Sequence, residues 1–492
     1  MTVLRFREYL PDLPAFNNPG VKEAKNVIPA DGGYKEFNAL KVFSTALTAR
    51  VQGAFCGVGS DGTVYDFAGD ATELYKLEDS TWSEVGKASG YATVSTDHWE
   101  FIQWKDQVLA TNFTDDIQTF TLGTSSVFAD LAGTPPKAKT IARVGDFVVV
   151  GHTSDASDGE VPYRVRWSGI NDESTWTVSS STQADFQDLD SGAGSVIKII
   201  GGDRGIIFQK KAITIMSYIG SPIVFQFDKV EENRGAIARK SVIKVGSFIY
   251  FLDEIGFFMF DGQRSIAIAD NKINDFFWKD LDIAYFDRVS GAIEPRENLI
   301  YWVYPGVGNN VGLPNKVLIY NYSLDSDVRW SIAELETEFV TNTCAPGYTL
   351  EGLDSISTSI DALPYSLDSP FWIGGSVVIA AFDKTHKMGL FDGDPLDSVI
   401  ETGEYQINDG IKSIIKNIRP LATSTSTVTM QVGERNNQSD PIVWGGSVAA
   451  SSSGDFKVRS NARYQSFRLN MQGGFEQAFG VDLISTRAGG RR

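Results

Sequence analysis

Short apolar segments, each preceded by a turn-forming residue pair, recur along most of the chain, and their spacing is the strongest constraint on its fold. They are KDQVLATN (105–112), GDFVVVGHT (145–153), DRGIIFQ (203–209), GSFIYFL (246–252), RENLIYWVY (296–304) and GGSVVIAAF (374–382). The segments are about 35 to 50 residues apart except around insertions. They are rich in β-branched and aromatic residues and are bounded by Gly, Asp or Asn, which predicts β-strands.

In several of these units a second strand is expected after a short turn. These second segments are DIQTFTL (116–122), YRVRWSG (163–169), AITIMSYIG (212–220), GFFMFDG (256–262) and KVLIYNY (316–322). Each unit is therefore predicted to be an antiparallel meander, and a strand-built period of this length indicates propeller blades. With an earlier unit at 62–85, we expect an all-β fold whose main part is a β-propeller of about seven antiparallel blades. The alternative, several independent sandwich domains, would need linkers that the sequence does not show.

At 492 residues the chain is too long for one ordinary core, and it is predicted to have three parts. Residues 1–40 are rich in Pro and Gly and predict an extended N-terminal arm that packs along the first blade or reaches a neighbouring subunit. Residues 41–410 form the propeller, with a long insertion at 337–370. Residues 411–492 show alternating segments that predict a small C-terminal β-sandwich-like domain with a basic tail, RAGGRR.

The charge of the chain is strongly uneven. Its formal net charge is -18, yet residues 411–492 hold eleven Lys and Arg against five Asp and Glu, so the excess of acid lies in the first 410 residues. This balance speaks against a protein that binds nucleic acid phosphates over its whole surface. The C-terminal strands carry four basic residues, Lys457, Arg459, Arg463 and Arg468. They alternate with the aromatic residues Phe456, Tyr464 and Phe467. We expect these four to dock an acidic protein partner; nucleic acid contact and a solvated strand face are the alternatives.

No catalytic set, metal site or cofactor is predicted. Cys56 and Cys344 are far apart in sequence and in no C-x-x-C pair, so we expect two buried small hydrophobic side chains. The three histidines, His98, His152 and His386, lie in different units without a triad signature and are expected to pack. The acidic segments SDASDGE (154–160) and FDGDPLD (391–397) lack EF-hand spacing. We expect solvated hairpin tips there, with an ion site as the less favoured alternative.

One segment, SGINDESTW (168–176), partly matches the Asp-containing turn found in propeller glycosidases and sialidases. Asp172 and Trp176 can close such a turn, but the glycine expected between them is absent and the motif occurs once. It motivates an alternative function, a propeller glycosidase or lectin acting on host surface polysaccharide. Hydrolysis would need two carboxylates at a set separation, which no sequence spacing indicates.

The N-terminal sequence MTVLRFREYLPDLPAF has no continuous apolar stretch, so no secretory signal is predicted. The most apolar segment, 248–260, is interrupted by Asp253 and Glu254, and no membrane span is predicted. Synthesis in the cytoplasm is expected.

Many phrases of the sequence resemble the tail nozzle or hub proteins of short-tailed bacteriophages, which are related in role to packaged-DNA stabilisation and tail tubular proteins. They are NNPGVKEAKNVIPADGGYKEF (17–37), WEFIQWKDQVLATN (99–112), FADLAGTPPKAKTIARVGDFVVVG (128–151), RVRWSGINDESTW (164–176), GSPIVFQFDKVEENRGA (220–236) and IDALPYSLDSPFW (360–372). The resemblance covers residues 10 to about 375 and rests on no single catalytic motif.

This resemblance implies a structural virion protein and no enzyme activity. It implies a six-fold homo-oligomeric ring in the virion tail, below the portal and its adaptor ring, that conducts double-stranded DNA and anchors tail fibre, spike or needle proteins. The excess of acid suits a conduit, because a basic lining would hold the phosphates that have to slide past. The resemblance gives no residues for the lining of the DNA channel.

Overall fold

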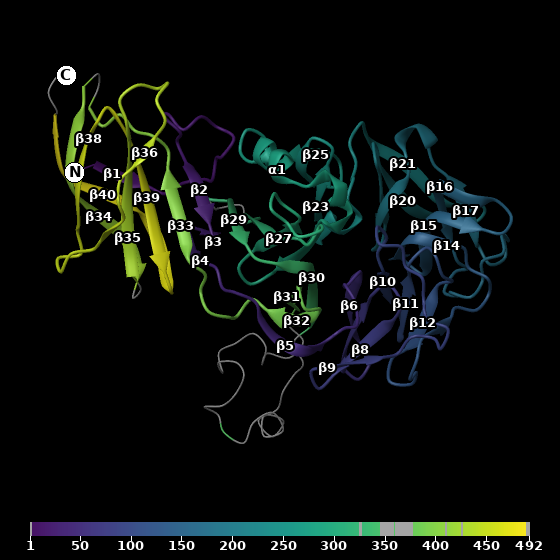
Figure 1. The fold of residues 1–492 in the computed structure, drawn as a ribbon. Helices are drawn as coiled ribbons and strands as arrows, with labels where there is room; N and C mark the ends of the chain where they lie inside the picture. The colour runs from purple at the N-terminus through teal and green to yellow at the C-terminus, as the bar shows by residue number, and fades with distance from the viewer. Residues whose placement is uncertain are drawn as a thin grey trace.

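The computed structural model describes residues 2–323, 327–344, 359, 377–408, 411–424 and 427–488. In this part of the chain nearly all regular structure is β-strand, with one α-helix, α1 (Asn274–Asp280), and three 3-10 helices, η1 (Ser191–Ala193), η2 (Arg239–Ser241) and η3 (Ile283–Arg288). The strands build a ring of small sheets and, beside it, a two-layered module at the left of Figure 1 that holds both ends of the chain.

The ring consists of six separate four-stranded sheets and a further four-stranded unit that belongs to a ten-stranded sheet. Unit 1 consists of β6 (Gly53–Val58), β7 (Val64–Gly69), β8 (Leu74–Glu78) and β9 (Thr81–Glu84). Unit 2 consists of β10 (Glu100–Trp104), β11 (Gln107–Thr111), β12 (Gln118–Thr121) and β13 (Ala129–Asp130). Unit 3 consists of β14 (Lys137–Val144), β15 (Phe147–Asp155), β16 (Gly159–Trp167) and β17 (Asp185–Asp188). Units 4 and 5 are β18 (Val196–Ile200), β19 (Gly205–Gln209), β20 (Ala212–Gly220) and β21 (Val224–Glu232); and β22 (Ile243–Val245), β23 (Phe248–Asp253), β24 (Gly256–Phe260) and β25 (Ser265–Ala267). Units 6 and 7 are β26 (Ser290–Glu294), β27 (Leu299–Tyr304), β28 (Lys316–Asn321) and β29 (Trp330–Glu334); and β30 (Thr337–Cys344), β31 (Val377–Asp383), β32 (Lys387–Leu390) and β5 (Lys41–Ala46).

The turn pairs noted in the sequence are the hairpin turns between the first and second strands of several units. Lys105 and Asp106 join Trp104 to Gln107, and Gly145 and Asp146 join Val144 to Phe147. The first residue of each turn has a positive φ, 53° at Lys105 and 55° at Gly145. Two-residue hairpins favour such values because they match the right-handed twist of the strands.

An apolar cluster fills the space between each pair of neighbouring units. Between units 1 and 2, for example, Phe67 packs with Phe120 and Phe128. A cluster between units 7 and 1, including Trp82 and Phe382, completes the circle. The last sheet takes its outer strand, β5, from the start of the chain, since β5 pairs with β32. The predicted all-β propeller is confirmed.

The module beside the ring has two facing sheets with a shared core. Its strands are β1 (Thr2–Arg5), β2 (Val21–Lys25), β3 (Val27–Ala30), β4 (Gly33–Glu36), β33 (Ser398–Thr402), β34 (Ser413–Ser424), β35 (Thr427–Arg435), β36 (Val443–Trp444), β37 (Val448–Ala449), β38 (Phe456–Ala462), β39 (Tyr464–Gln472) and β40 (Phe475–Ala488). One sheet has the order β3-β4-β40-β34-β38, with β1 also on β40. The other continues from unit 6 through β29-β2-β33-β39-β35.

The N-terminal residues, expected to form an extended arm, are therefore built into this module. β2 pairs in parallel with β29 of the propeller and antiparallel with β33. The Glu8 carboxylate fixes the segment by accepting hydrogen bonds from the backbone N–H groups of Arg329 and Trp330 at 3.0 and 2.9 Å. These partners are distant in sequence, so no local sequence pattern predicts the pairing.

The other expected boundaries also change. β33, which lies before residue 410, pairs with β39 of the module. Of the insertion expected at 337–370, residues 337–344 form β30, the first strand of unit 7, and the remainder lies outside the described residues except for Ser359. No helix within the described ranges has the length and apolar character that crossing a membrane requires.

Candidate docking surface and polar channel

Strand β38 lies at the edge of its sheet and carries the predicted basic residues. It pairs with β34 alone, and its residues alternate between buried and exposed from Phe456 to Ala462. Lys457 and Arg459 are on the exposed face, and Arg463 is exposed directly after the strand. No ion pair or side-chain hydrogen bond joins these three to any described residue. Charged side chains on an edge strand also prevent pairing with a further strand, so the surface resists non-specific sheet extension.

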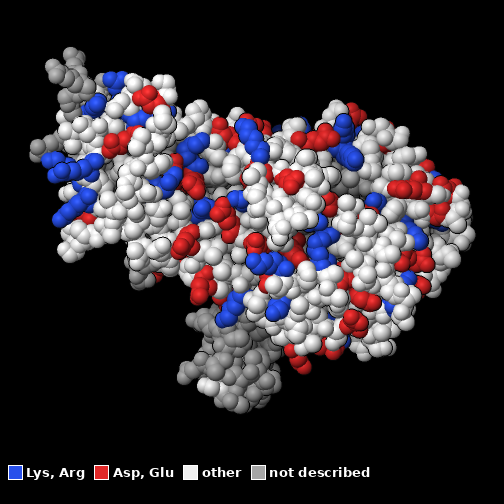
Figure 2. Space-filling model, in the orientation of Figure 1, with Lys and Arg blue, Asp and Glu red and all other residues white. Residues whose placement is uncertain are grey.

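The basic surface extends onto the neighbouring strand β34. Lys416 and Arg419 are exposed there, and Arg419 Nε donates to Asp455 Oδ1 at 2.9 Å. Figure 2 shows Lys and Arg gathered over this end of the molecule. We call Lys416, Lys457, Arg459 and Arg463 the basic surface. Lys416 was not among the predicted residues, although its place in the alternating segment IKSIIKNIRP carries the same signal as the β38 pattern.

The fourth predicted docking residue, Arg468, does not belong to this surface. It lies on β39 in the other sheet, where Nε and Nη2 bond to Glu401 Oε2 at 2.9 and 2.6 Å. Its guanidinium carbon is 3.9 Å from the centre of the Trp444 ring. Alternation along a strand indicates an outward face but not the sheet to which the strand belongs, so the sequence could not show that Arg468 lies apart from the other three; its docking role stays a prediction.

A cluster of buried charges occupies the centre of the propeller, where the first strands of neighbouring units meet. Glu100 on β10 pairs with Lys198 of β18 and, at 3.1 Å, with Lys240 of η2. Asp97 pairs with Lys139 at 3.1 Å and lies 3.7 Å from Arg239. The cluster links units 2 to 5.

The electrostatics of this cluster hold it in its charged form. Burial alone would raise the pKa of Glu100, but Lys198, Lys240 and Arg239 together outweigh burial and lower that pKa to about 2. Burial lowers the pKa of Lys240 to about 8, with Glu100 opposing the shift. Around the same centre, burial and then Lys240 and Arg239 lower the pKa of His98 to about 3, so this imidazole is neutral at pH 7.

Each histidine has a structural partner. The His98 ring makes its hydrogen bond, 2.7 Å long, to the backbone oxygen of Asp287. His152 Nε2 is 2.7 Å from Glu160, and His386 Nδ1 is 2.8 Å from Glu338. None of these rings shares a hydrogen bond with a serine, threonine or cysteine side chain among the described residues.

The segment matching a glycosidase turn has a structural role. Asp172 Oδ1 accepts from the Ser174 backbone at 3.0 Å, and Oδ2 accepts from Thr175 Oγ1 at 2.6 Å. The Trp176 ring is buried and its Nε1 donates to the Glu173 carbonyl. Both predicted residues therefore close and anchor one turn of unit 3.

The acidic hairpin tip at 154–160 is also engaged by the protein. Asp155 accepts from the backbone of Ser157 and Asp158 and pairs with Arg166 at 3.0 Å. Asp158 pairs with Arg164. The described residues contain no group of three or more His, Cys, Asp or Glu arranged to hold a metal ion.

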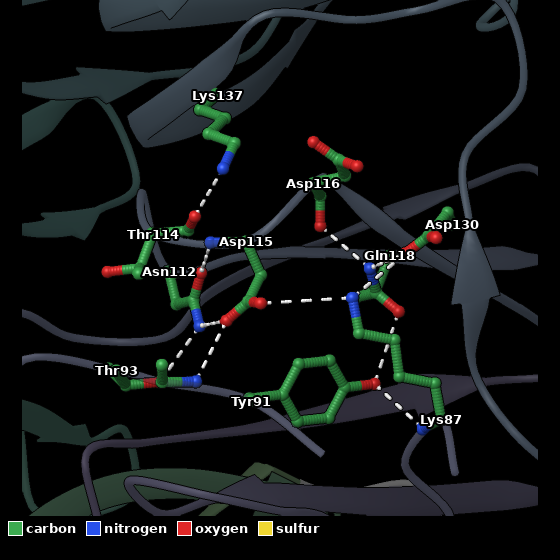
Figure 3. A network of polar contacts seen from close by, with 11 residues as sticks. Lys87, Tyr91, Thr93, Asn112, Thr114, Asp115, Asp116, Gln118, Asp130 and Lys137 are labelled. Carbon is green, nitrogen blue, oxygen red and sulfur yellow. Dashed lines mark hydrogen bonds and ion pairs between the residues drawn. The ribbon is translucent and has the colours of Figure 1, made fainter. Parts of the chain in front are cut away.

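A network with the residue types of an active site lies between units 1 and 2 (Figure 3). Lys87 pairs with Asp130 at 3.2 Å, and Tyr91 donates to Gln118 at 3.1 Å. Asn112 Nδ2 bonds to both Thr93 and Asp115 at 2.9 Å. Burial raises the pKa of Tyr91, which keeps its hydroxyl protonated. The groups satisfy one another, so this network fastens the loop 85–99 to unit 2.

A cavity of about 430 Å³ at the junction of propeller and module has several carboxylates in its lining. Glu36 accepts from the backbone of Phe475 at 2.7 Å, and Glu297 pairs with Lys35 at 3.0 Å. Glu294, whose pKa burial raises, accepts from the backbone of Arg296. These acids are committed to structural contacts.

Cys56 and Cys344 do not match the expectation of two separate buried side chains. Both are partly exposed and free. The two side chains line one cavity, because β6 and β30 lie side by side. Sequence separation concealed this contact.

No family model matches this sequence, and no curated protein matches it. Among solved structures, the computationally designed Ika8 protein is 9% identical over 72% of this chain and 98% of its own, with a TM-score of 0.34. The WD40 domain of Neurospora crassa Pan2 is 6% identical over 73% of this chain and 96% of its own, with a TM-score of 0.39.

Proposed function

We propose that this chain is a structural virion protein that forms the tail nozzle ring of a short-tailed phage. In this role it assembles as a six-fold homo-oligomer, surrounds the path of double-stranded DNA, and anchors the portal adaptor ring and the fibre, spike or needle proteins. It acts without catalysis and resides in the virion tail. The phrase-level resemblance of residues 10 to about 375 motivates the proposal.

The observation that carries the proposal is the unpaired basic surface on an otherwise acidic chain. The net charge of the whole chain is -18, so the body of a second copy is a complementary partner for Lys457, Arg459 and Arg463. Contact between the module of one copy and the propeller of the next is a heterologous interface, and such interfaces generate rings when the rotation closes.

The continuity of the sheet from propeller into module supports the same role. Because β2 is hydrogen-bonded to β29 on one side and β33 on the other, the propeller and the module share one continuous sheet. A ring subunit that withstands the passage of DNA needs such a continuous connection between its parts.

Charge reversal on the basic surface tests the proposal. We expect the purified wild-type chain to form a ring, visible by electron microscopy and native mass measurement, and K457E/R459E/R463E to remain monomeric with an unchanged circular dichroism spectrum. The matched control R264E/K279E/K384E makes the same charge change at exposed side chains of the propeller and should assemble normally. A wild-type chain that is strictly monomeric and absent from virions would refute the proposal.

The propeller glycosidase or lectin is the competing function. Its motivating residue, Asp172, has its carboxylate oxygens engaged by Ser174 and Thr175. Incubation of the wild-type chain with host surface polysaccharide separates the two functions. Binding or cleavage that survives in the monomeric triple variant would favour the glycan function over the nozzle.

A further inference from the structure

The two cysteines of this chain meet at the seam where the propeller ring closes. They are the only cysteines in the sequence. Cys56 lies on β6, the first strand of unit 1, and Cys344 ends β30, the first strand of unit 7. These strands pack side by side, and both cysteines line the same cavity.

Both thiols can be reached from a cavity. Cys56 and Cys344 line a cavity of about 330 Å³ whose wall also contains Lys198, Arg239 and Lys240. Arg239 has two buried N–H groups, at Nε and Nη1, without a partner among the described residues. This wall attracts a small anionic reagent, because the ammonium and guanidinium groups outnumber the acids paired with them.

The surroundings of the pair assign different roles to the two sulfurs. The neighbouring Cys56 thiol lowers the pKa of Cys344, and the Cys344 thiol raises the pKa of Cys56. Asp66 lies beside them, accepts from Thr343 Oγ1 at 2.5 Å, and has a pKa that burial raises to about 6. Cys344 is therefore the sulfur that ionises first and attacks, because the thiolate is the nucleophile in exchange reactions.

We propose that Cys56 and Cys344 form a disulfide that joins the first and last units of the propeller, made by exchange with an anionic low-molecular-weight disulfide such as oxidised glutathione. The Cys344 thiolate attacks one glutathione sulfur, breaks its S–S bond and releases one glutathione thiolate. The Cys56 thiolate then attacks Cys344 Sγ in the mixed disulfide and releases the second. The protein dithiol is oxidised, glutathione disulfide is reduced, and the two cysteine protons end on the two glutathione thiols.

The contact requires little movement. The two side chains lie on adjacent strands and line one cavity, so rotation about χ1 is the movement needed to bring the sulfurs together. The bond adds a covalent closure to the ring, which is otherwise closed by strand β5 and apolar packing. This site is independent of the proposed function.

Peptide mapping tests the proposal. The full chain is incubated with oxidised glutathione at pH 8 and is then digested with trypsin without reductant. We expect both thiols to become unreactive toward maleimide without disulfides between chains, and residues 51–76 to become linked to residues 330–384. The thermal midpoint should rise and should return to its starting value after reduction.

The single variants C344S and C56S are the controls. Each should give no linked peptide and no rise in thermal midpoint. The proposal is overturned if the wild-type chain keeps both thiols, carries glutathione separately on each cysteine, or forms disulfides only between chains. These outcomes are read from wild-type peptides, so they hold even if a variant fails to fold.

Discussion

Replacing Glu100 with glutamine should destabilise the propeller more than any change to a surface charge. The residue Glu100 is only 1% exposed, and its carboxylate lies between Lys198 and Lys240 at the centre of the ring. The E100Q variant keeps the shape of the side chain but leaves two ammonium groups near a neutral amide. Charges left unpaired in the interior are costly because water cannot solvate them there.

Two estimates of the stability lost in the E100Q variant agree. The pKa of Glu100 falls from 4.5 to about 2 on folding, which corresponds to about 3 kcal/mol of stability at neutral pH. Removing one partner of a buried ion pair costs about 3–5 kcal/mol in other proteins. Because the folded pKa is the lower one, this stability is present above about pH 4.5 and is lost as the pH falls toward 2. The gap between E100Q and wild type should close over that range.

Urea denaturation at pH 7 and at several acidic pH values measures the effect as a lower midpoint with an unchanged slope. The matched control is E232Q, because Glu232 is exposed and 3.7 Å from Lys229, and such pairs contribute about 0–1 kcal/mol. The double variant E100Q/K240M should recover part of the loss, since it removes one of the unpaired charges. An E100Q midpoint equal to that of E232Q, or a gap that stays constant down to pH 2, would refute the reasoning.

Three further changes test other parts of the structure. R468E places a carboxylate against Glu401 and should lower the thermal midpoint of the module, whereas R468K should have a smaller effect. D12A removes the acceptor for the first backbone N–H groups of α1 and should cost about 1 kcal/mol, seen as faster hydrogen exchange in residues 274–280, with D12N as the control. D172A should cost about 1–3 kcal/mol by urea denaturation and leave polysaccharide binding unchanged; lost binding with normal stability would instead give Asp172 a ligand role.

The sequence identified the second strand of many units and missed the first. Strands such as β23 and β27 lie inside their sheets with both faces covered, so they are continuous apolar runs. The first strands contribute to the buried charge cluster and therefore mix charged with apolar residues, as Glu100 and Lys198 illustrate. A search for apolar runs passes over them, and the buried charge cluster was missed for the same reason.

The candidate sites divide in a similar way between local and distant information. Lys457 and Arg459 were predictable because buried and exposed residues alternate over the seven consecutive residues of β38. The position of Arg468 depends on which sheet receives β39, and the contact between Cys56 and Cys344 depends on closure of the whole ring. Neither is encoded near the residue concerned.

The placement of the first strands explains why composition gave the wrong division of the chain. β2 completes a sheet only when β29 and β33 are present, and β5 completes unit 7 only when β32 is present. Pairing between such distant segments has to bear the loop-closure entropy before its contacts form, which makes it late in folding. Ring closure and assembly of the module therefore depend on the same N-terminal segment. The charge reversal near residue 410 marks a change in the charge of the chain, while the module takes strands from both sides of that point.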